Sequence, residues 1–119
     1  MTSTATHIRV QDLNGIKRIE FVERNILDEA NIQQIGEEIS RVVDEQEVPR
    51  VVISFLNVDH LSSAALGTLI TVNNKIRGRN GQLALAEIDP QIYEVFVITK
   101  LNKLFNIFDS SEQAMASFG

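Results

Sequence analysis

The segment from Val51 to Ile70 constrains the fold more than any other stretch of the chain. It begins with a run of apolar, mostly β-branched residues ending near Phe55, which is typical of a central strand covered on both faces. A polar connecting segment follows. Ser62 and Ser63 then precede a stretch in which apolar residues recur at helical spacing, and this stretch predicts a helix. A buried strand that is joined to a helix by a short connecting segment predicts a layered α/β fold.

The residues before this junction predict a hairpin and a helix. Apolar segments at residues 8–10 and 16–21 flank Asn14-Gly15, a dipeptide that favours the tight turn of a β-hairpin. We expect a connecting loop over residues 23–29. Asn31 and Gln34 have the spacing of a helix cap and its reciprocal partner, and the apolar residues after them recur at helical spacing until Pro49.

The residues after the junction continue the alternation of helices and strands. The helix that follows the serines is expected to stop at Gly78 and Gly81, with a short strand over residues 82–86. Asp89-Pro90 predicts the start of a third helix, Ile107 lies near a short last strand, and residues 112–118 form a final helix. We therefore expect one α/β domain over residues 1–119, in which an N-terminal hairpin and β-α-β-α-β-α crossovers build a mixed sheet with about four helices.

Composition excludes several classes of function. The net charge of −5 argues against nucleic-acid binding, and the absence of cysteine excludes disulfides and thiolate metal sites. No apolar run approaches the ~20 residues of a membrane span, and the polar N-terminal segment lacks the apolar core of a signal peptide. We expect a cytoplasmic protein that contacts neither membrane nor nucleic acid, either a monomer or a weak homodimer. Residues 1–60 carry 11 acids and 6 bases, which favours a partner with a basic patch.

The side chains offer little for catalysis. His7 falls in the predicted N-terminal tail, and a nucleophilic pair of Ser63 with His60 lacks a clearly placed acid to orient the imidazole. Asp59 and His60 are adjacent but have no partners at metal-ligand spacing. A phosphorylated receiver domain would need an acidic pair that Asp12, in the hairpin turn, and Asp59 do not supply. We expect no enzymatic activity, no metal site and no cofactor.

The two serines at the junction have two interpretations. Serine is among the preferred helix caps, and from the spacing alone a structural cap is favoured. Alternatively, one hydroxyl accepts a phosphoryl group at the helix N-terminus, where the helix dipole tolerates an anion.

A motif at the start of the second predicted helix bears on this choice. It reads Ser62-Ser63-Ala64-Ala65-Leu66-Gly67. A glycine-containing turn at residues 79–83, an Asp-Pro helix start at 88–92, and the segments 99–105 and 108–114 follow in register. Together these segments resemble the STAS family, and specifically its single-domain anti-sigma-factor antagonists, whose junction motif reads Asp-Ser-Ser-Gly-Leu-Gly.

The resemblance implies a mixed sheet with helices and a non-enzymatic function. Such antagonists bind a serine-kinase anti-sigma factor and so release a sigma factor. The kinase inactivates the antagonist by phosphorylating the motif serine, and a metal-dependent serine phosphatase reverses this. By position that serine is Ser63, with Ser62 as a minor alternative. The resemblance also implies that Asp28 contacts the partner. We expect the partner-binding surface to consist of Asp28, Asp59, Ser62, Ser63 and Ala64.

This chain departs from the family motif at three positions. Ser62 stands in place of the motif aspartate, and Ala64 and Ala65 stand in place of a serine and a glycine. Related family members regulate other partners, including phosphatases and larger signalling assemblies. The alternative hypothesis is therefore a STAS interaction module that regulates such a partner without phosphorylation.

Overall fold

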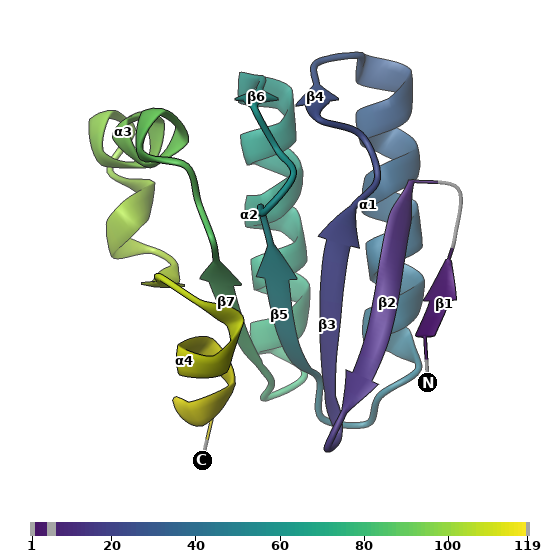
Figure 1. Cartoon of the computed structure of the whole chain (residues 1–119). Helices are drawn as coiled ribbons and strands as arrows, with labels where there is room; N and C mark the ends of the chain where they lie inside the picture. The colour runs from purple at the N-terminus through teal and green to yellow at the C-terminus, as the bar shows by residue number, and fades with distance from the viewer. Residues whose placement is uncertain (1, 5–6, 119) are drawn as a thin grey trace.

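A six-stranded sheet organises the computed structural model, which describes residues 2–4 and 7–118. The strands lie in the order β1-β2-β3-β5-β7-β8 (Figure 1), with bounds β1 (Thr2–Thr4), β2 (Ile8–Leu13), β3 (Ile16–Phe21), β5 (Arg50–Ser54), β7 (Gln82–Ala86) and β8 (Asn106–Phe108). The first three are antiparallel, and β3, β5, β7 and β8 pair in parallel. This mixed sheet with its N-terminal hairpin confirms the predicted fold class.

Helices cover both faces of the sheet. Their bounds are α1 (Glu29–Asp44), α2 (Ser63–Gly78), α3 (Pro90–Ile98), the 3-10 turn η1 (Leu101–Lys103) and α4 (Ser111–Ala116). In Figure 1, α1 and α2 run side by side across one face, and α3 lies beyond the carboxyl end of β7. The short α4 packs on the opposite face, against β5 and β7.

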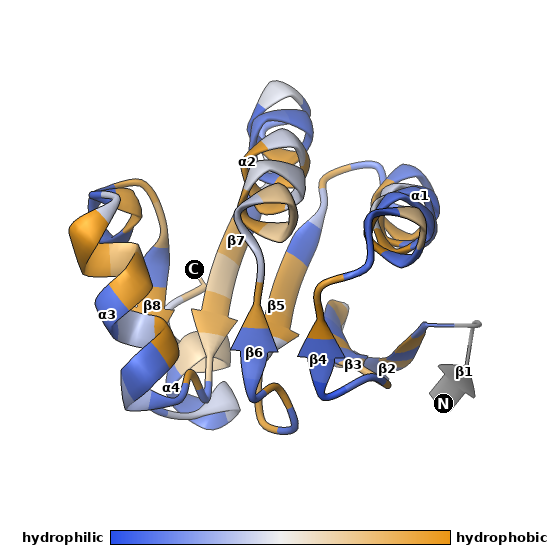
Figure 2. Ribbon diagram, turned by 90° about the horizontal axis from the view of Figure 1, so that it is seen from above, coloured by the Kyte–Doolittle hydropathy of each residue, from blue (hydrophilic) through white to orange (hydrophobic). Residues whose placement is uncertain are grey.

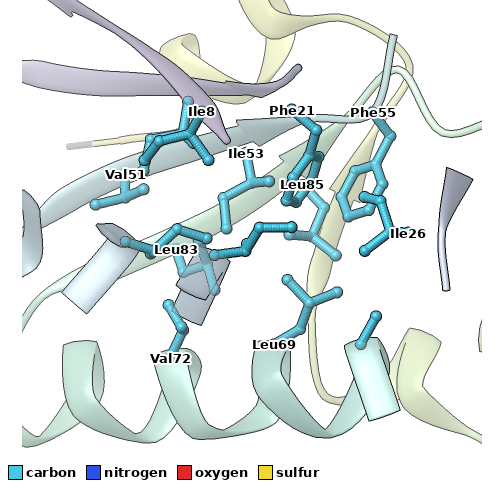
Figure 3. Packing of buried hydrophobic residues seen from close by; sticks show 14 of the residues in the cluster. Ile8, Phe21, Ile26, Val51, Ile53, Phe55, Leu69, Val72, Leu83 and Leu85 are labelled. Atoms are coloured by element: carbon cyan, nitrogen blue, oxygen red, sulfur yellow. The ribbon is translucent and has the colours of Figure 1, made fainter. Parts of the chain in front are cut away.

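Alternating side chains of the central strands supply two hydrophobic cores. Val51 and Ile53 of β5 face α1 and α2, where they pack with residues such as Leu69 and Leu85 (Figure 3). Val52 points to the other face and packs in a smaller core. That smaller core also contains Ile16, Ala84, Ala86 and Ala114. Burial on both faces explains why the β5 sequence is almost continuously apolar.

The predicted hairpin turn is confirmed. Asn14 and Gly15 have φ angles of 54° and 82°, which is the left-handed region that a two-residue type I′ turn requires. Leu13 and Ile16 are consequently paired across the ladder.

The start of α1 differs from the prediction. The cap is Asp28, whose carboxylate accepts a hydrogen bond of 3.1 Å from the backbone N–H of Asn31. Asn31 was the predicted cap and lies inside the first turn of the helix. The predicted loop over residues 23–29 therefore contains the cap and first residue of α1, as well as a short strand described below.

The end of α2 also differs in detail. The helix ends at Gly78, but the left-handed residue after it is Asn80, with φ of 61°. Gly81 is needed for a different reason, because a Cβ there would lie 2.3 Å from the carbonyl oxygen of Pro49.

The N-terminal segment is not a tail where it is described. Residues 1, 5 and 6 lie outside the described residues, but β1 pairs with β2 and His7 is only 6% exposed. The backbone N–H of His7 donates to Glu38 at 3.0 Å, and its ring nitrogens contact carboxylate and amide oxygens of Glu23 and Gln34. These contacts, led by the hydrogen bond to Glu23, raise the pKa of His7 above 6.5.

Candidate functional site

A second, two-stranded sheet joins the regions where α1 and α2 begin. Strands β4 (Asn25–Ile26) and β6 (His60–Leu61) pair in parallel beyond the carboxyl ends of β3 and β5 (Figure 2). The carbonyl of Arg24 accepts from the backbone N–H groups of Asp59 and His60, at 2.7 and 3.3 Å. Strands of two residues carry no periodic signal, so this pairing was not predictable from the sequence pattern.

The register of this small sheet fixes the first residues of both helices. Ile26 pairs with Leu61, and the carbonyl of Ile26 accepts a 3.0 Å hydrogen bond from the backbone N–H of Ser62. Asp28 begins α1 two residues after Ile26, and Ser62 begins α2 directly after Leu61. The two helix N-termini therefore point to the same edge of the molecule.

Ser62 and Ser63 occupy different positions at the start of α2. Ser62 is the N-cap, and its hydroxyl oxygen accepts a 3.2 Å hydrogen bond from the backbone N–H of Ala65. Ser63 is the first residue of the helix and is exposed, as is Ala64. Within the described part of the chain, the Ser63 hydroxyl has no hydrogen-bond partner. One serine thus stabilises the helix, while the next presents a free hydroxyl to solvent.

The two predicted acidic residues both precede Ser62 and Ser63 in the chain. Asp28 is exposed at the start of α1, where it serves as the cap. Asp59 lies in the loop between β5 and β6 and accepts a 2.9 Å hydrogen bond from Nε of Arg24. This contact raises the pKa of Arg24 above its usual value. The β4–β6 pairing brings both acidic segments to the edge that carries Ser63.

His60 is engaged elsewhere. Its Nδ1 lies 2.8 Å from the side-chain oxygen of Asn25, and no hydrogen bond joins it to Ser63 among residues 7–118. The same residues contain no group of three or more His, Asp or Glu side chains that could hold a metal ion. None of the helices that the structure describes has both the length and the apolar composition to cross a membrane.

Exposed hydrophobic side chains occur mainly in segments that follow the carboxyl ends of the strands. Among the described residues, seven large hydrophobics are exposed. Six of them follow the carboxyl end of a strand, either in the connecting loops or on α3: Val22, Leu27, Leu56, Tyr93, Val97 and Ile98. Leu56 and Ile98 are 62% and 79% exposed. Exposed apolar side chains in such connecting segments are candidates for contact with a protein partner. Apolar character alone does not reveal this feature, because the exposed Val97 and Ile98 are as apolar as the buried Phe96 of the same helix.

Comparison with known proteins identifies the family. A family model described as the STAS domain matches residues 8–114. The chain is 34% identical over 95 residues to BtrV of Bordetella bronchiseptica, described as a candidate anti-sigma factor antagonist, and the match spans 80% of this chain and 81% of BtrV.

Solved structures share the fold. An anti-sigma-factor antagonist (STAS) domain protein from Planctomyces limnophilus superposes with a TM-score of 0.84 at 21% identity, over 92% of this chain and 96% of that one. The phosphorylated form of the Bacillus cell fate determinant SpoIIAA gives a TM-score of 0.68 at 17% identity, over 92% and 96% of the two chains. This chain belongs to the STAS domain family.

Proposed function

We propose that this protein is an anti-sigma factor antagonist controlled by phosphorylation of Ser63. In this role it binds a serine-kinase anti-sigma factor in the cytoplasm and so frees a sigma factor to direct transcription. The similarity to BtrV over four-fifths of both chains supports the general role. The observation that carries the switch is the exposed, unpaired hydroxyl of Ser63 at the first residue of α2.

The proposed switch requires only an acceptor from this chain. The kinase transfers the γ-phosphoryl group of ATP to the Ser63 oxygen, ADP leaves, and the hydroxyl proton is released. Phosphate adds a charge of about −1.5 to −2. The N-terminus of α2 tolerates that charge because its backbone N–H groups and the helix dipole favour anions. The fold is therefore expected to persist while the surface changes.

The surface around Ser63 explains how a phosphate would oppose binding. The exposed side chains of Leu27 and Leu56 lie at the same edge as Ser63, and docking a partner on them removes water from that edge. A phosphate placed there must lose part of its hydration when the partner docks. Asp28 already places a negative charge at this edge, whereas the charge of Asp59 is matched by Arg24, so the phosphate makes the edge more acidic. Removal of the phosphate by a metal-dependent serine phosphatase restores binding.

Ser63 is a better acceptor than Ser62. The Ser62 hydroxyl oxygen is occupied by the N–H of Ala65, and the Ser62 side chain is only half exposed. Reaction at Ser62 would disturb the cap, whereas reaction at Ser63 leaves it in place.

The phosphorylation site can be tested by mass spectrometry. Purified serine-kinase anti-sigma factors of the same organism are incubated with ATP and the wild-type chain, Ser63→Ala or Ser62→Asn. Asparagine caps helices about as well as serine, so Ser62→Asn removes a hydroxyl while keeping the cap. We expect one phosphate on the wild type and on Ser62→Asn, and none on Ser63→Ala. Phosphate that persists on Ser63→Ala would contradict the assignment.

A constitutive STAS interaction module is the second candidate. The exposed hydrophobic side chains at this edge favour it, because they could bind a phosphatase or a signalling assembly without any covalent switch. Partner binding that is indifferent to both Ser63→Ala and Ser63→Asp would support this candidate over the first.

A further inference from the structure

An open groove runs between α1 and α2, next to Ser63. Its volume is about 750 Å³, and it begins at Ala64, the residue after Ser63. On α1 it extends from Gln33 to Asp44, which corresponds to a length of about 16 Å at the rise of an α-helix. Both walls are helices whose backbone groups are already paired, so an extended peptide would find no backbone partners here.

Gly67 lies in this groove, and no contact among the described residues requires a glycine at this position. It stands in the second turn of α2, where glycine is a poor helix former. Its φ is not positive, and a Cβ added to it would meet no atom within 4 Å. Gly36, across the groove, differs, because a Cβ there would lie 3.0 Å from the methyl group of Thr68. Gly36 therefore serves the packing of α1 on α2, whereas Gly67 does not.

The position of Gly67 relative to Ser63 suggests what it serves. The two residues are four apart, so they lie on the same side of α2, one turn from each other. Both are exposed, as is Thr71 one further turn along. A residue without a side chain lets another helix approach the α2 backbone closely, since helix separation depends on the side chains at the contact.

The charges along the groove specify its occupant further. Glu37 and Arg41 of α1 line it and are exposed, and neither has an ion pair within the described residues. They are one turn apart, at a separation of about 6 Å along the helix axis. Asp44, at the far end, is already paired with Lys75 and Arg79 at 3.0 and 3.1 Å. The groove therefore complements a helix with a basic residue opposite Glu37 and an acidic residue opposite Arg41.

We propose that the α1–α2 groove receives a helix of the partner kinase, packed closely on Gly67 and paired with Glu37 and Arg41. This inference rests on the proposed function, since it names the surface by which that partner is held. The groove proposal also gives phosphorylation a steric effect on binding. The groove begins at Ala64, so a phosphate on the adjacent Ser63 obstructs the partner helix at that end.

Binding measurements with matched controls test this proposal. Isothermal titration calorimetry is performed between the unphosphorylated chain and the purified serine-kinase anti-sigma factor that phosphorylates Ser63. Gly67→Leu fills the groove, and its control is Gly78→Leu, at an exposed glycine of the same helix that also has no atom within 4 Å of a Cβ. Glu37→Lys reverses a charge in the groove, and its control is Glu45→Lys, at the exposed C-cap of α1.

We expect Gly67→Leu to raise Kd at least tenfold and Glu37→Lys to raise it several-fold, while each control stays within twofold of the wild type. Circular dichroism checks that the variants fold. Wild-type affinity for both Gly67→Leu and Glu37→Lys, with normal phosphorylation of Ser63, would overturn the groove proposal and leave the proposed function intact. A wild-type chain that neither binds any such kinase nor accepts phosphate would instead overturn the proposed function, and the groove proposal with it.

Discussion

At the scale of single residues, the protein separates two tasks between adjacent serines. Ser62 holds the first turn of α2 through its bond to Ala65, and Ser63 projects into solvent. The family motif has an aspartate at the first of these positions, and both residue types are good helix caps. The replacement by Ser62 therefore preserves the cap and removes one negative charge beside Ser63.

Substitutions at these two serines should affect stability differently. Ser63→Asp should change the free energy of unfolding by less than about 1 kcal/mol, because an anion in the first turn of a helix is tolerated. Ser62→Ala should lower that free energy by about 1 kcal/mol, because the cap is lost. Urea denaturation of both variants measures the difference. A large loss for Ser63→Asp would show that Ser63 is structural.

His7 predicts a dependence of stability on pH. Hydrogen bonding to Glu23 and to Gln34 raises its pKa in the folded protein above 6.5. The folded state therefore binds the proton more tightly than the unfolded chain does. The stabilisation is complete below pH 6.5 and is lost as the pH rises through the folded pKa. Urea denaturation at several pH values from 6 to 9 should show this loss, and His7→Gln should reduce it. An equal decline in His7→Gln would assign the effect to another group.

At the scale of elements, local residue chemistry predicted some boundaries and not others. Asn14-Gly15 and Asp89-Pro90 act through their own backbone preferences, so the hairpin and the start of α3 were predictable. The start of α1 was not, because Asp28 and Asn31 are both good caps and the apolar spacing that begins at Ile32 does not choose between them. The β4–β6 pairing ends at Ile26 and makes Asp28 the cap, and this contact joins residues 35 positions apart.

Two glycines, Gly67 within α2 and Gly81 after its end, should respond to alanine in opposite ways. Gly67→Ala should raise the free energy of unfolding by about 0.5–1 kcal/mol, because alanine is the better helix former and its Cβ meets nothing within 4 Å. Gly81→Ala should lower it by about 1–3 kcal/mol, because the Cβ would overlap the carbonyl oxygen of Pro49. Thermal or urea denaturation measures both, and a destabilised Gly67→Ala would remove the argument that Gly67 has no packing role within the chain.

At the scale of the whole molecule, one polar network joins the sheet to α4. Glu87 follows β7 with a left-handed φ of 59°. It accepts hydrogen bonds from Ser54 at 2.5 Å and from the backbone and hydroxyl of Ser111 at 3.0 and 2.8 Å, and it pairs with Arg18 at 3.2 Å. The partners come from β3, β5 and α4, so sequence periodicity carried no sign of the network. The order of the longer strands and the helices was predictable because each of them has its own apolar pattern, which β1, β4 and β6 lack.

Glu87 should contribute stability that is lost in acid. Burial alone would raise its pKa, but the hydrogen bonds from Ser54 and Ser111 and the charge of Arg18 outweigh burial and lower it below 4.5. The contribution is thus present above pH 4.5 and is lost as the pH falls through the folded pKa. Glu87→Gln should lower the free energy of unfolding at pH 7 by about 1–3 kcal/mol, because hydrogen-bonding groups in a partly buried site are left without partners. Urea denaturation from pH 7 to pH 3 should also show a weaker acid dependence in the variant. Unchanged stability at pH 7 would mean that the network contributes nothing.

The affinity of the serine-kinase anti-sigma factor for the two forms of this protein is the most direct test of the proposed switch. The chain phosphorylated on Ser63 and the unphosphorylated chain are titrated under the same conditions, with ADP present so that no further transfer occurs. The exposed position of Ser63 beside the groove and the apolar edge predicts at least a tenfold higher Kd for the phosphorylated form. Equal affinity of the two forms would contradict it.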